Sequence, residues 1–224
     1  MNVNQVYSIV LYAAAKNKQD GYISPDDFNL IINQAQDSYL DYLKGEYQKY
    51  QIRRPISVVE FGENQMIRQS LAALIYSTII PINNVTGIGV PPSDYEFADA
   101  MWGLYGFYNI RFIQQDRLDS YYHSTIDPIA SYPVYYLNND GFNFLPTTIG
   151  NSRLSYVRTP PPITWGYDED GNGLPVYNAA KSQQPVWADT DLLQIIVRAL
   201  ALVGVNLQTV MISQYANEIK QGGQ

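Results

Sequence analysis

Apolar residues recur at helical spacing in the N-terminal part of the chain. They form two stripes, one before and one after a polar loop at residues 16–28, and each follows the 3.6-residue period of an amphipathic helix. Ser24 and Pro25 suit the N-cap and the first position of the second helix. The pattern predicts a helix–turn–helix hairpin. The first stripe contains Val3, Val6, Tyr7, Val10, Leu11 and Ala14, and the second contains Phe28, Ile31, Ile32, Ala35, Tyr39, Tyr42 and Leu43.

Further helical patterns follow. Residues 63–75 carry an apolar stripe, which predicts a third helix. Near the C-terminus, a helix that begins at Asp189 or Thr190 is apolar around much of its circumference, so we expect it to be deeply buried. A last amphipathic helix is expected over residues 207–220.

Between these helical regions the pattern changes to short β-prone runs. Residues 76–187 carry most of the prolines and glycines, and the sequence NNDG at 138–141 is a strong hairpin turn between two such runs. Closely spaced strands of this kind indicate an antiparallel sheet or a small sandwich. The expected strands are Ala100–Tyr108, Ile110–Ile113, Pro133–Leu137, Phe142–Leu145 and Arg153–Arg158, with a further short strand at Ile56–Phe61.

The order of these elements predicts an α+β fold. We expect the N-terminal and C-terminal helices to form a helical bundle, with an antiparallel β-rich domain inserted between them. The expected regions are residues 1–75 (N-terminal helical), residues 76–188 (inserted and β-rich) and residues 189–224 (C-terminal helices that pack back on the N-terminal bundle).

Composition and charge narrow the functional classes. The chain has 224 residues, of which 46% are hydrophobic and 16% charged, as in ordinary folded proteins. Its net charge is −7 and its longest basic run is Arg53–Arg54, so the cationic surface that grips nucleic acid is not expected. The N-terminus has no basic signal region, and no apolar run is long enough to span a membrane. Twenty tyrosines favour an interaction protein over a small enzyme.

The loop at residues 16–28 partly matches a calcium-binding EF-hand. Its Gly21 and flanking aspartates fit the pattern, but Lys16 and Lys18 stand where the ion requires its first and third oxygen ligands. Two ammonium groups would repel a calcium ion. We expect no metal in this loop.

The sequence YDEDGNG at residues 167–173 supplies the ligands that the first loop lacks. Asp168 and Asp170 match the first and third calcium positions, but Ala179 stands where the final carboxylate is required. We interpret the segment as a β-hairpin tip, and leave an adventitious cation at Asp168 and Asp170 as the alternative. No dedicated metal site and no cofactor are expected.

No catalytic residues are expected either. The chain has no cysteine, and His123 is its one histidine. His123 stands beside Ser124, but the motif of a nucleophilic serine is missing. The acid pair Asp26–Asp27 could be imagined in a glycosidase, yet it is explained by its place in the first turn of a helix.

The sequence YVRTPPPITWGY at residues 156–167 is the least generic run. It predicts a strand, then a stiff polyproline II segment, then a second strand that bears aromatic residues. A packed corner within the subunit and a contact with a partner both explain it. The candidate residues for an oligomer or partner interface are Tyr156, Arg158, Trp165, Tyr167 and Trp187.

Several runs, taken in order, resemble virion structural proteins of tailed bacteriophages, of the head-to-tail connector or adaptor ring type found in crAss-like phages. Together they cover most of the chain. They are KNKQDGYISPDDFNLIINQAQDSYLDYL, PPSDY, the P-x-Y-Y strand at 133–136, LSYVRTPPPITWGY, SQQPVWADTDLLQIIVRALALVGVNL and QYA at 214–216.

The resemblance implies a non-enzymatic subunit of a ring between portal and tail, assembled in the host cytoplasm and located at the head-tail junction of the virion. Its implied partners are copies of itself, in a dodecamer by family analogy, the portal protein, and neighbouring tail or ring proteins. Genomic DNA would pass through the lumen without sequence-specific binding, and no membrane would be involved. The alternatives are a carbohydrate-binding or adhesion module of a phage tail, with Trp165 and Trp187 exposed, and a small glycoside hydrolase.

Overall fold

The computed structural model describes residues 1–17, 23–51, 58–104, 108–119 and 128–204. The predicted helix at 207–220 and the pair His123–Ser124 lie outside these residues. The chain is a mixed α+β protein, as predicted, and divides into two compact units. The first unit is Met1–Ala73 with Pro160–Gln224, and the second is Leu74–Thr159.

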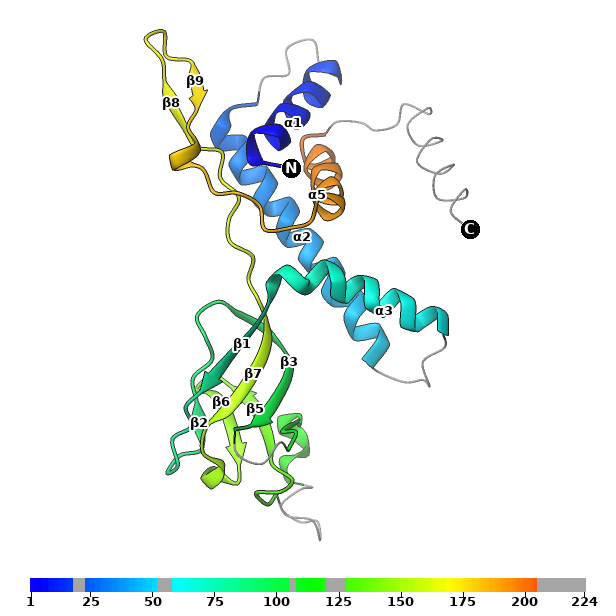
Figure 1. The fold of residues 1–224 in the computed structure, drawn as a ribbon, viewed down its shortest axis with the longest axis vertical. Helices are drawn as coiled ribbons and strands as arrows, with labels where there is room; N and C mark the ends of the chain where they lie inside the picture. Colours follow the sequence, from blue (N-terminus) through cyan, green and yellow to red (C-terminus); the bar gives the residue numbers. More distant parts are fainter. Residues whose placement is uncertain (18–22, 52–57, 105–107, 120–127, 205–224) are drawn as a thin grey trace. The chain divides into compact units, whose positions relative to one another are not determined.

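The first unit holds the long helices together with one small hairpin (Figure 1). Helices α2 and α5 contact each other, and α5 also contacts α1. Buried residues of α2, such as Phe28, Ile32 and Tyr39, and buried residues of α5, such as Leu192 and Ile195, supply much of this unit's core. The elements are α1 (Val3–Asn17), α2 (Pro25–Gln51), α3 (Val58–Leu71), β8 (Tyr167–Glu169), β9 (Pro175–Tyr177) and α5 (Asp189–Leu202).

The start of α2 follows the predicted capping chemistry. The Ser24 hydroxyl accepts a hydrogen bond from the Asp27 amide at 3.1 Å and donates one to the Asp27 carboxylate at 2.7 Å. The helix then begins at Pro25, which occupies the first helical position.

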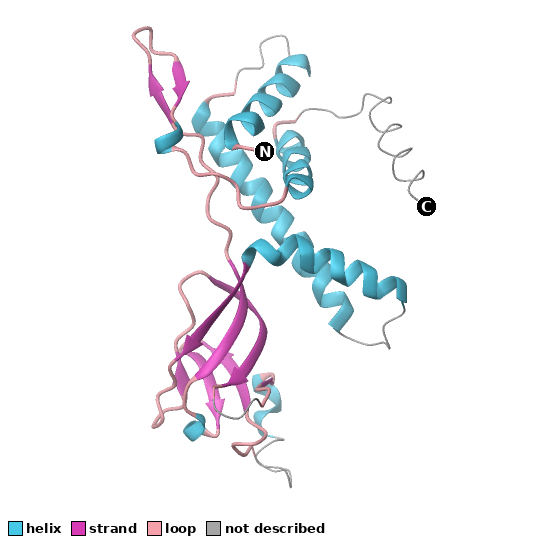
Figure 2. Cartoon of the chain, in the orientation of Figure 1, coloured by secondary structure: helices cyan, strands magenta, loops and turns pink. Residues whose placement is uncertain are grey.

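The second unit contains two sheets, which the magenta arrows of Figure 2 show. One sheet has the order β1-β7-β3 and is antiparallel. The other has the order β2-β6-β5-β4, in which β4 and β5 are parallel while the remaining pairs are antiparallel. The strands are β1 (Ile75–Ile80), β2 (Ile88–Gly89), β3 (Tyr95–Gly103), β4 (Arg111–Phe112), β5 (Val134–Asn138), β6 (Gly141–Leu145) and β7 (Ser152–Arg158).

Side chains from both sheets share one core in this unit. Met101 and Leu154 come from the first sheet, and Phe142 and Phe144 come from the second; all four are buried. The ring of Phe142 also contacts Tyr95, with centroids 5.2 Å apart. The small sandwich expected from the strand pattern therefore agrees with the way the two sheets pack.

The boundary between the units differs from the predicted one. Residues 160–188 were expected in the β-rich region, but they cluster with the helices instead. The physical reason is a row of side-chain amides on α2 that holds the extended segment after Pro160, described below.

Candidate functional site

The proline-rich segment is bound along α2 by side-chain amides. Asn33 donates to the Ile163 carbonyl and accepts from the Ile163 amide, both at 2.8 Å. Asn29 makes the same pair of bonds with Trp165, at 3.3 and 2.7 Å. Gln36 donates to the Pro161 carbonyl at 3.2 Å. The three amides thus contact alternate residues of the extended chain, as a neighbouring strand would.

The residue spacing along a helix explains why α2 can bond an extended segment in this regular way. A step of four residues along a helix advances about 6 Å, and two residues of extended chain advance about 6.2–6.6 Å. Asn29 and Asn33 are four residues apart, and their partners Trp165 and Ile163 are two apart. The helix and the segment therefore match in register, and they run in opposite directions.

Trp165, at the end of this segment, belongs to an aromatic cluster inside the unit. Its ring centroid lies 4.3 Å from that of Tyr7, 5.9 Å from that of Tyr167 and 5.8 Å from that of Tyr177. Its indole N–H donates to the Asn4 side chain at 3.0 Å, and its side chain is 4% exposed. Most of the Trp165 surface therefore contacts other residues of the same chain.

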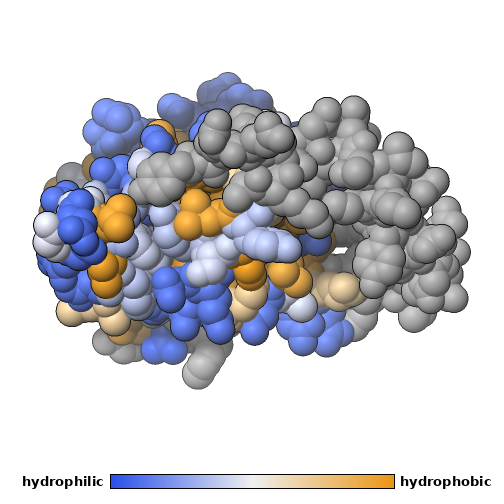
Figure 3. All heavy atoms as spheres, turned by 90° about the horizontal axis from the view of Figure 1, so that it is seen from above, coloured by the Kyte–Doolittle hydropathy of each residue, from blue (hydrophilic) through white to orange (hydrophobic). Residues whose placement is uncertain are grey.

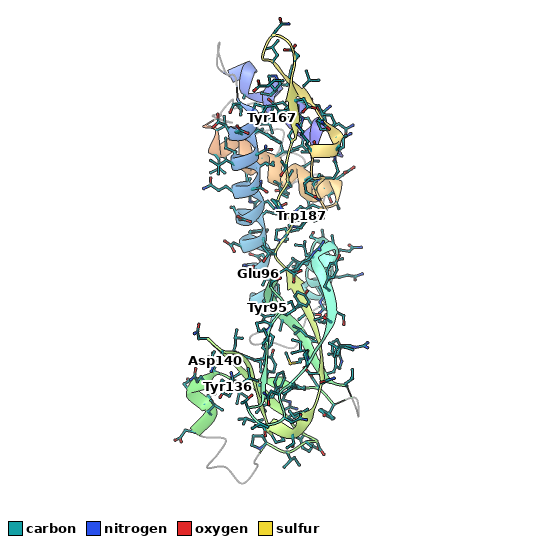
Figure 4. The ribbon with its side chains drawn as sticks, turned by 90° about the vertical axis from the view of Figure 1, so that its left-hand side faces the viewer. Tyr95, Glu96, Tyr136, Asp140, Tyr167 and Trp187 are labelled. Atoms are coloured by element: carbon teal, nitrogen blue, oxygen red, sulfur yellow. The ribbon has the colours of Figure 1, made fainter. Side chains whose placement is uncertain are left out.

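Trp187 is not part of this aromatic cluster and stands two residues before the start of α5 (Figure 4). Its indole N–H donates to Gln36 at 3.0 Å and its ring meets Tyr39 edge-on at 5.3 Å. Its exposure is also 4%. Gln36 is buried and bonds both the proline-rich segment and this indole, so one residue links two chain segments to α2.

A buried carboxylate is bonded to Tyr39, the residue whose ring contacts Trp187. Asp191, in the first turn of α5, accepts hydrogen bonds from the Tyr39 hydroxyl at 2.6 Å and the Ser70 hydroxyl at 2.9 Å. Burial, and then the bond to Asp191, raise the pKa of Tyr39 above its ordinary value. The N-terminal end of a helix also favours a negative charge. The arrangement joins α2, α3 and α5, and each of its polar groups has a structural partner.

Tyr156 and Arg158 belong to the second unit, whereas Trp165, Tyr167 and Trp187 belong to the first. The Tyr156 hydroxyl donates to Asp94 at 2.9 Å, and burial, followed by this bond, raises the Tyr156 pKa. The Arg158 guanidinium lies 4.2 Å from the centre of the Tyr76 ring, a cation–π contact. Tyr156 is buried, whereas Arg158 is half-buried.

Of the five predicted interface residues, Trp165 and Tyr167 are thus brought together. Three of the five (Tyr156, Trp165 and Trp187) are 4–5% exposed. Their packing corresponds to the alternative prediction of a corner within the subunit. Arg158 and Tyr167 remain half-exposed.

The acidic segment at 167–173 comprises β8 and most of the turn of the β8–β9 hairpin, and its two aspartates have partners from the protein. Asp168 bonds the Lys181 ammonium and the Asn178 amide, and these bonds, the lysine first, lower its pKa. Asp170 accepts from the amides of Leu174 and Asn172, which lowers its pKa as well. Within the described part of the chain, no cluster of histidine and acidic residues suits a metal ion.

The sequence analysis missed the residues that organise this region, namely Asn29, Asn33, Gln36 and Asp191. A signal for the amides was present, because positions 29, 33 and 36 share one face of a helix. No helix in the described residues has the length and apolar character needed to cross a membrane.

No protein-family model and no curated protein matches the chain.

Proposed function

We propose that this protein is a non-enzymatic virion structural protein, a subunit of a connector or adaptor ring between portal and tail. The structural observation that carries the proposal is that helices from both ends of the chain, α1, α2 and α5, belong to one unit, whereas residues 74–159 form another. We take this as a helical bundle with an inserted β-rich domain. In such a subunit the bundle would contact copies of itself and the β-rich part an adjoining component.

Exposed apolar side chains on the helices support an assembly role. Ile9 and Tyr12 of α1 are 38% and 74% exposed, and Leu193 and Val197 of α5 are 52% and 49% exposed. Figure 3 shows apolar side chains interspersed with polar ones on the visible surface. Closed rings require complementary patches on different sides of each subunit, and such residues are suited to them.

The polar groups support a non-catalytic role. The acid pair Asp168 and Asp170, and the buried Asp191, each accept hydrogen bonds from neighbouring protein groups, so their positions are explained without a substrate. The carbohydrate-binding alternative has less support, because it needs exposed coplanar aromatic rings and the two tryptophans named for it, Trp165 and Trp187, are buried.

The acidic net charge of −7 suits a conduit for DNA. A lumen lined by carboxylates repels phosphates and lets the duplex slide, whereas a basic lumen would hold it. We propose that genomic DNA passes through the ring in this way. A reconstruction of the assembled ring with a lumen lined by lysine and arginine would contradict this part of the proposal.

Native mass spectrometry of the purified chain, alone and mixed with its portal protein, tests the proposal. We expect a closed cyclic oligomer, formed alone or on the portal. A chain that stays monomeric in the presence of the portal, and that is missing from the head-tail junction in images of the virion, would contradict it.

A further inference from the structure

The β8–β9 hairpin carries an exposed apolar and acidic tip. The two strands pair with each other alone in the described structure, and a two-stranded ribbon is marginally stable by itself. Leu174 and Val176 are 61% and 53% exposed, and the exposed carboxylates Asp170 and Asp168 lie opposite them on the same face of the ribbon. The base of the ribbon is anchored, since Tyr167 stacks on Trp165. A hairpin that is anchored at its base and exposes apolar side chains beyond it is suited to contact another surface.

One side of α5 is an exposed apolar surface. Leu193, Val197 and Ala201 recur every fourth residue, so they form one stripe along the helix, and all three are exposed. The buried residues Leu192, Ile195, Ile196 and Ala199 lie on the other side, against the unit's core. We call the exposed row the α5 stripe.

The charges beside the two surfaces are opposite. Arg198 flanks the α5 stripe, and its guanidinium lies 5.0 and 5.2 Å from the ring centres of Tyr39 and Tyr42. No acidic residue follows Asp191 in this helix. The hairpin face that bears Leu174 and Val176 contributes Asp170 and Asp168, of which Asp168 also pairs with Lys181. Contact between the two surfaces would therefore pair apolar with apolar and carboxylate with guanidinium.

The two surfaces lie on different sides of the same unit. In Figure 1 the yellow hairpin is on one side of α1 and α2, and the orange helix α5 is on the other. A contact between unlike surfaces of identical chains is heterologous, and repetition of such a contact closes into a ring when the rotation permits.

We propose that the β8–β9 hairpin of one copy docks on the α5 stripe of the next copy. This inference rests on the proposed ring function and identifies the contact between neighbouring subunits. Val176 and Leu174 would pack against Leu193 and Val197, with the acidic tip next to Arg198.

Crosslinking tests the contact directly, because the chain has no native cysteine. Copies carrying Val176→Cys are mixed with copies carrying Val197→Cys under assembly conditions and treated with a short thiol crosslinker. We expect a dimer that contains one copy of each variant. The matched control replaces Val197→Cys with Val85→Cys, a valine that is 87% exposed outside the proposed contact. Equal yield in the control, or crosslinks of Val197→Cys copies to each other alone, would overturn the inference.

Assembly measurements separate this inference from the proposed function. Val197→Asp should weaken self-association at least about tenfold, because a charge would be buried without a partner, whereas Val85→Asp should leave association unchanged. If the original chain forms rings and Val197→Asp forms them equally well, the docking inference fails and the ring function stands. If the original chain forms no ring with the portal, the proposed function fails. If Val197→Asp lowers the free energy of unfolding of the isolated chain much more than Gln194→Asp, a control at an exposed polar position of the same helix, the stripe is covered by the same copy and the inference is overturned.

Discussion

The Asn33 side chain pairs with the backbone of Ile163 through two reciprocal hydrogen bonds, each 2.8 Å long. A side chain on a helix here makes the two hydrogen bonds that the backbone of a neighbouring strand would make. The extended segment after Pro160 contains successive prolines, which lack amide donors, so it is poorly suited to a β-sheet. Side-chain amides of α2 bond every second residue of the segment, and they supply the partners that these backbone amides and carbonyls need.

Asn33→Ala should therefore lower the free energy of unfolding by about 1–3 kcal/mol, because it leaves an amide and a carbonyl of Ile163 without partners in a part-buried place. Urea denaturation followed by circular dichroism measures the change. Asn172→Ala, at the exposed hairpin turn, is the matched control and should change stability little. Equal stability of the two variants would show that the amide pair does not hold the segment.

The local part of the fold could be predicted from sequence, because it rests on local chemistry. Ser24 and Pro25 mark the start of α2, and the predicted turn at 138–141 joins β5 to β6. The prediction of a strand at Ile56–Phe61 was wrong for the described residues, since Val58 onward belongs to α3. The run Ile75–Ile80 was missed as β1 because it follows a helical stripe without a break.

The parts that failed depend on contacts between distant residues. Nothing within residues 160–188 indicates that Asn29 and Asn33 bind them, so composition alone placed them with the strands. The predicted deep burial of α5 holds for one side only: that side packs on α2, whereas Leu193 and Val197 remain exposed. An apolar pattern identifies what can be buried, but it does not identify the partner that covers it.

The indole N–H of Trp187 offers a second test of packing on α2. Trp187→Phe keeps an aromatic ring beside Tyr39 but removes the bond to Gln36, and should cost about 1–3 kcal/mol because the buried Gln36 oxygen loses its donor. Differential scanning calorimetry measures the change. Gln36→Leu by itself also removes the bond to the Pro161 carbonyl, but the double variant with Trp187→Phe should lose less than the sum of the two single effects, because both changes remove the same Trp187–Gln36 bond. A double variant that is less stable by the sum of the single effects would contradict this account.

Stability should fall at alkaline pH because of Tyr39. Its folded-state pKa is raised above the ordinary value of 10.0, so the unfolded chain releases this proton first. The contribution is fully present at neutral pH and is lost progressively as the pH rises above 10.0. The pKa values of Tyr95, Tyr135 and Tyr156 are raised as well and act in the same direction.

Urea titrations at several pH values from neutral to alkaline measure this loss. Tyr39→Phe should reduce the slope of the unfolding free energy against pH above 10.0 by up to one proton equivalent. Tyr12→Phe is the matched control, because Tyr12 is 74% exposed, and it should leave the slope unchanged. An unaltered slope in Tyr39→Phe would show that this hydroxyl does not titrate on unfolding.

Gly141 is a position where the backbone requires glycine. Its φ is +120°, a conformation that other residues rarely adopt, and an added Cβ would lie 2.7 Å from the Gly89 carbonyl oxygen. Gly141→Ala should therefore destabilise the β-rich unit by about 1–3 kcal/mol, through strain at the turn and displacement of β2 from β6. Gly171→Ala is the control, since open space surrounds Gly171 at the other hairpin turn. Thermal unfolding followed by circular dichroism measures the melting temperature of both variants. If Gly141→Ala melts at the same temperature as the original chain, β2 and β6 can move apart without loss of stability, and this account is wrong.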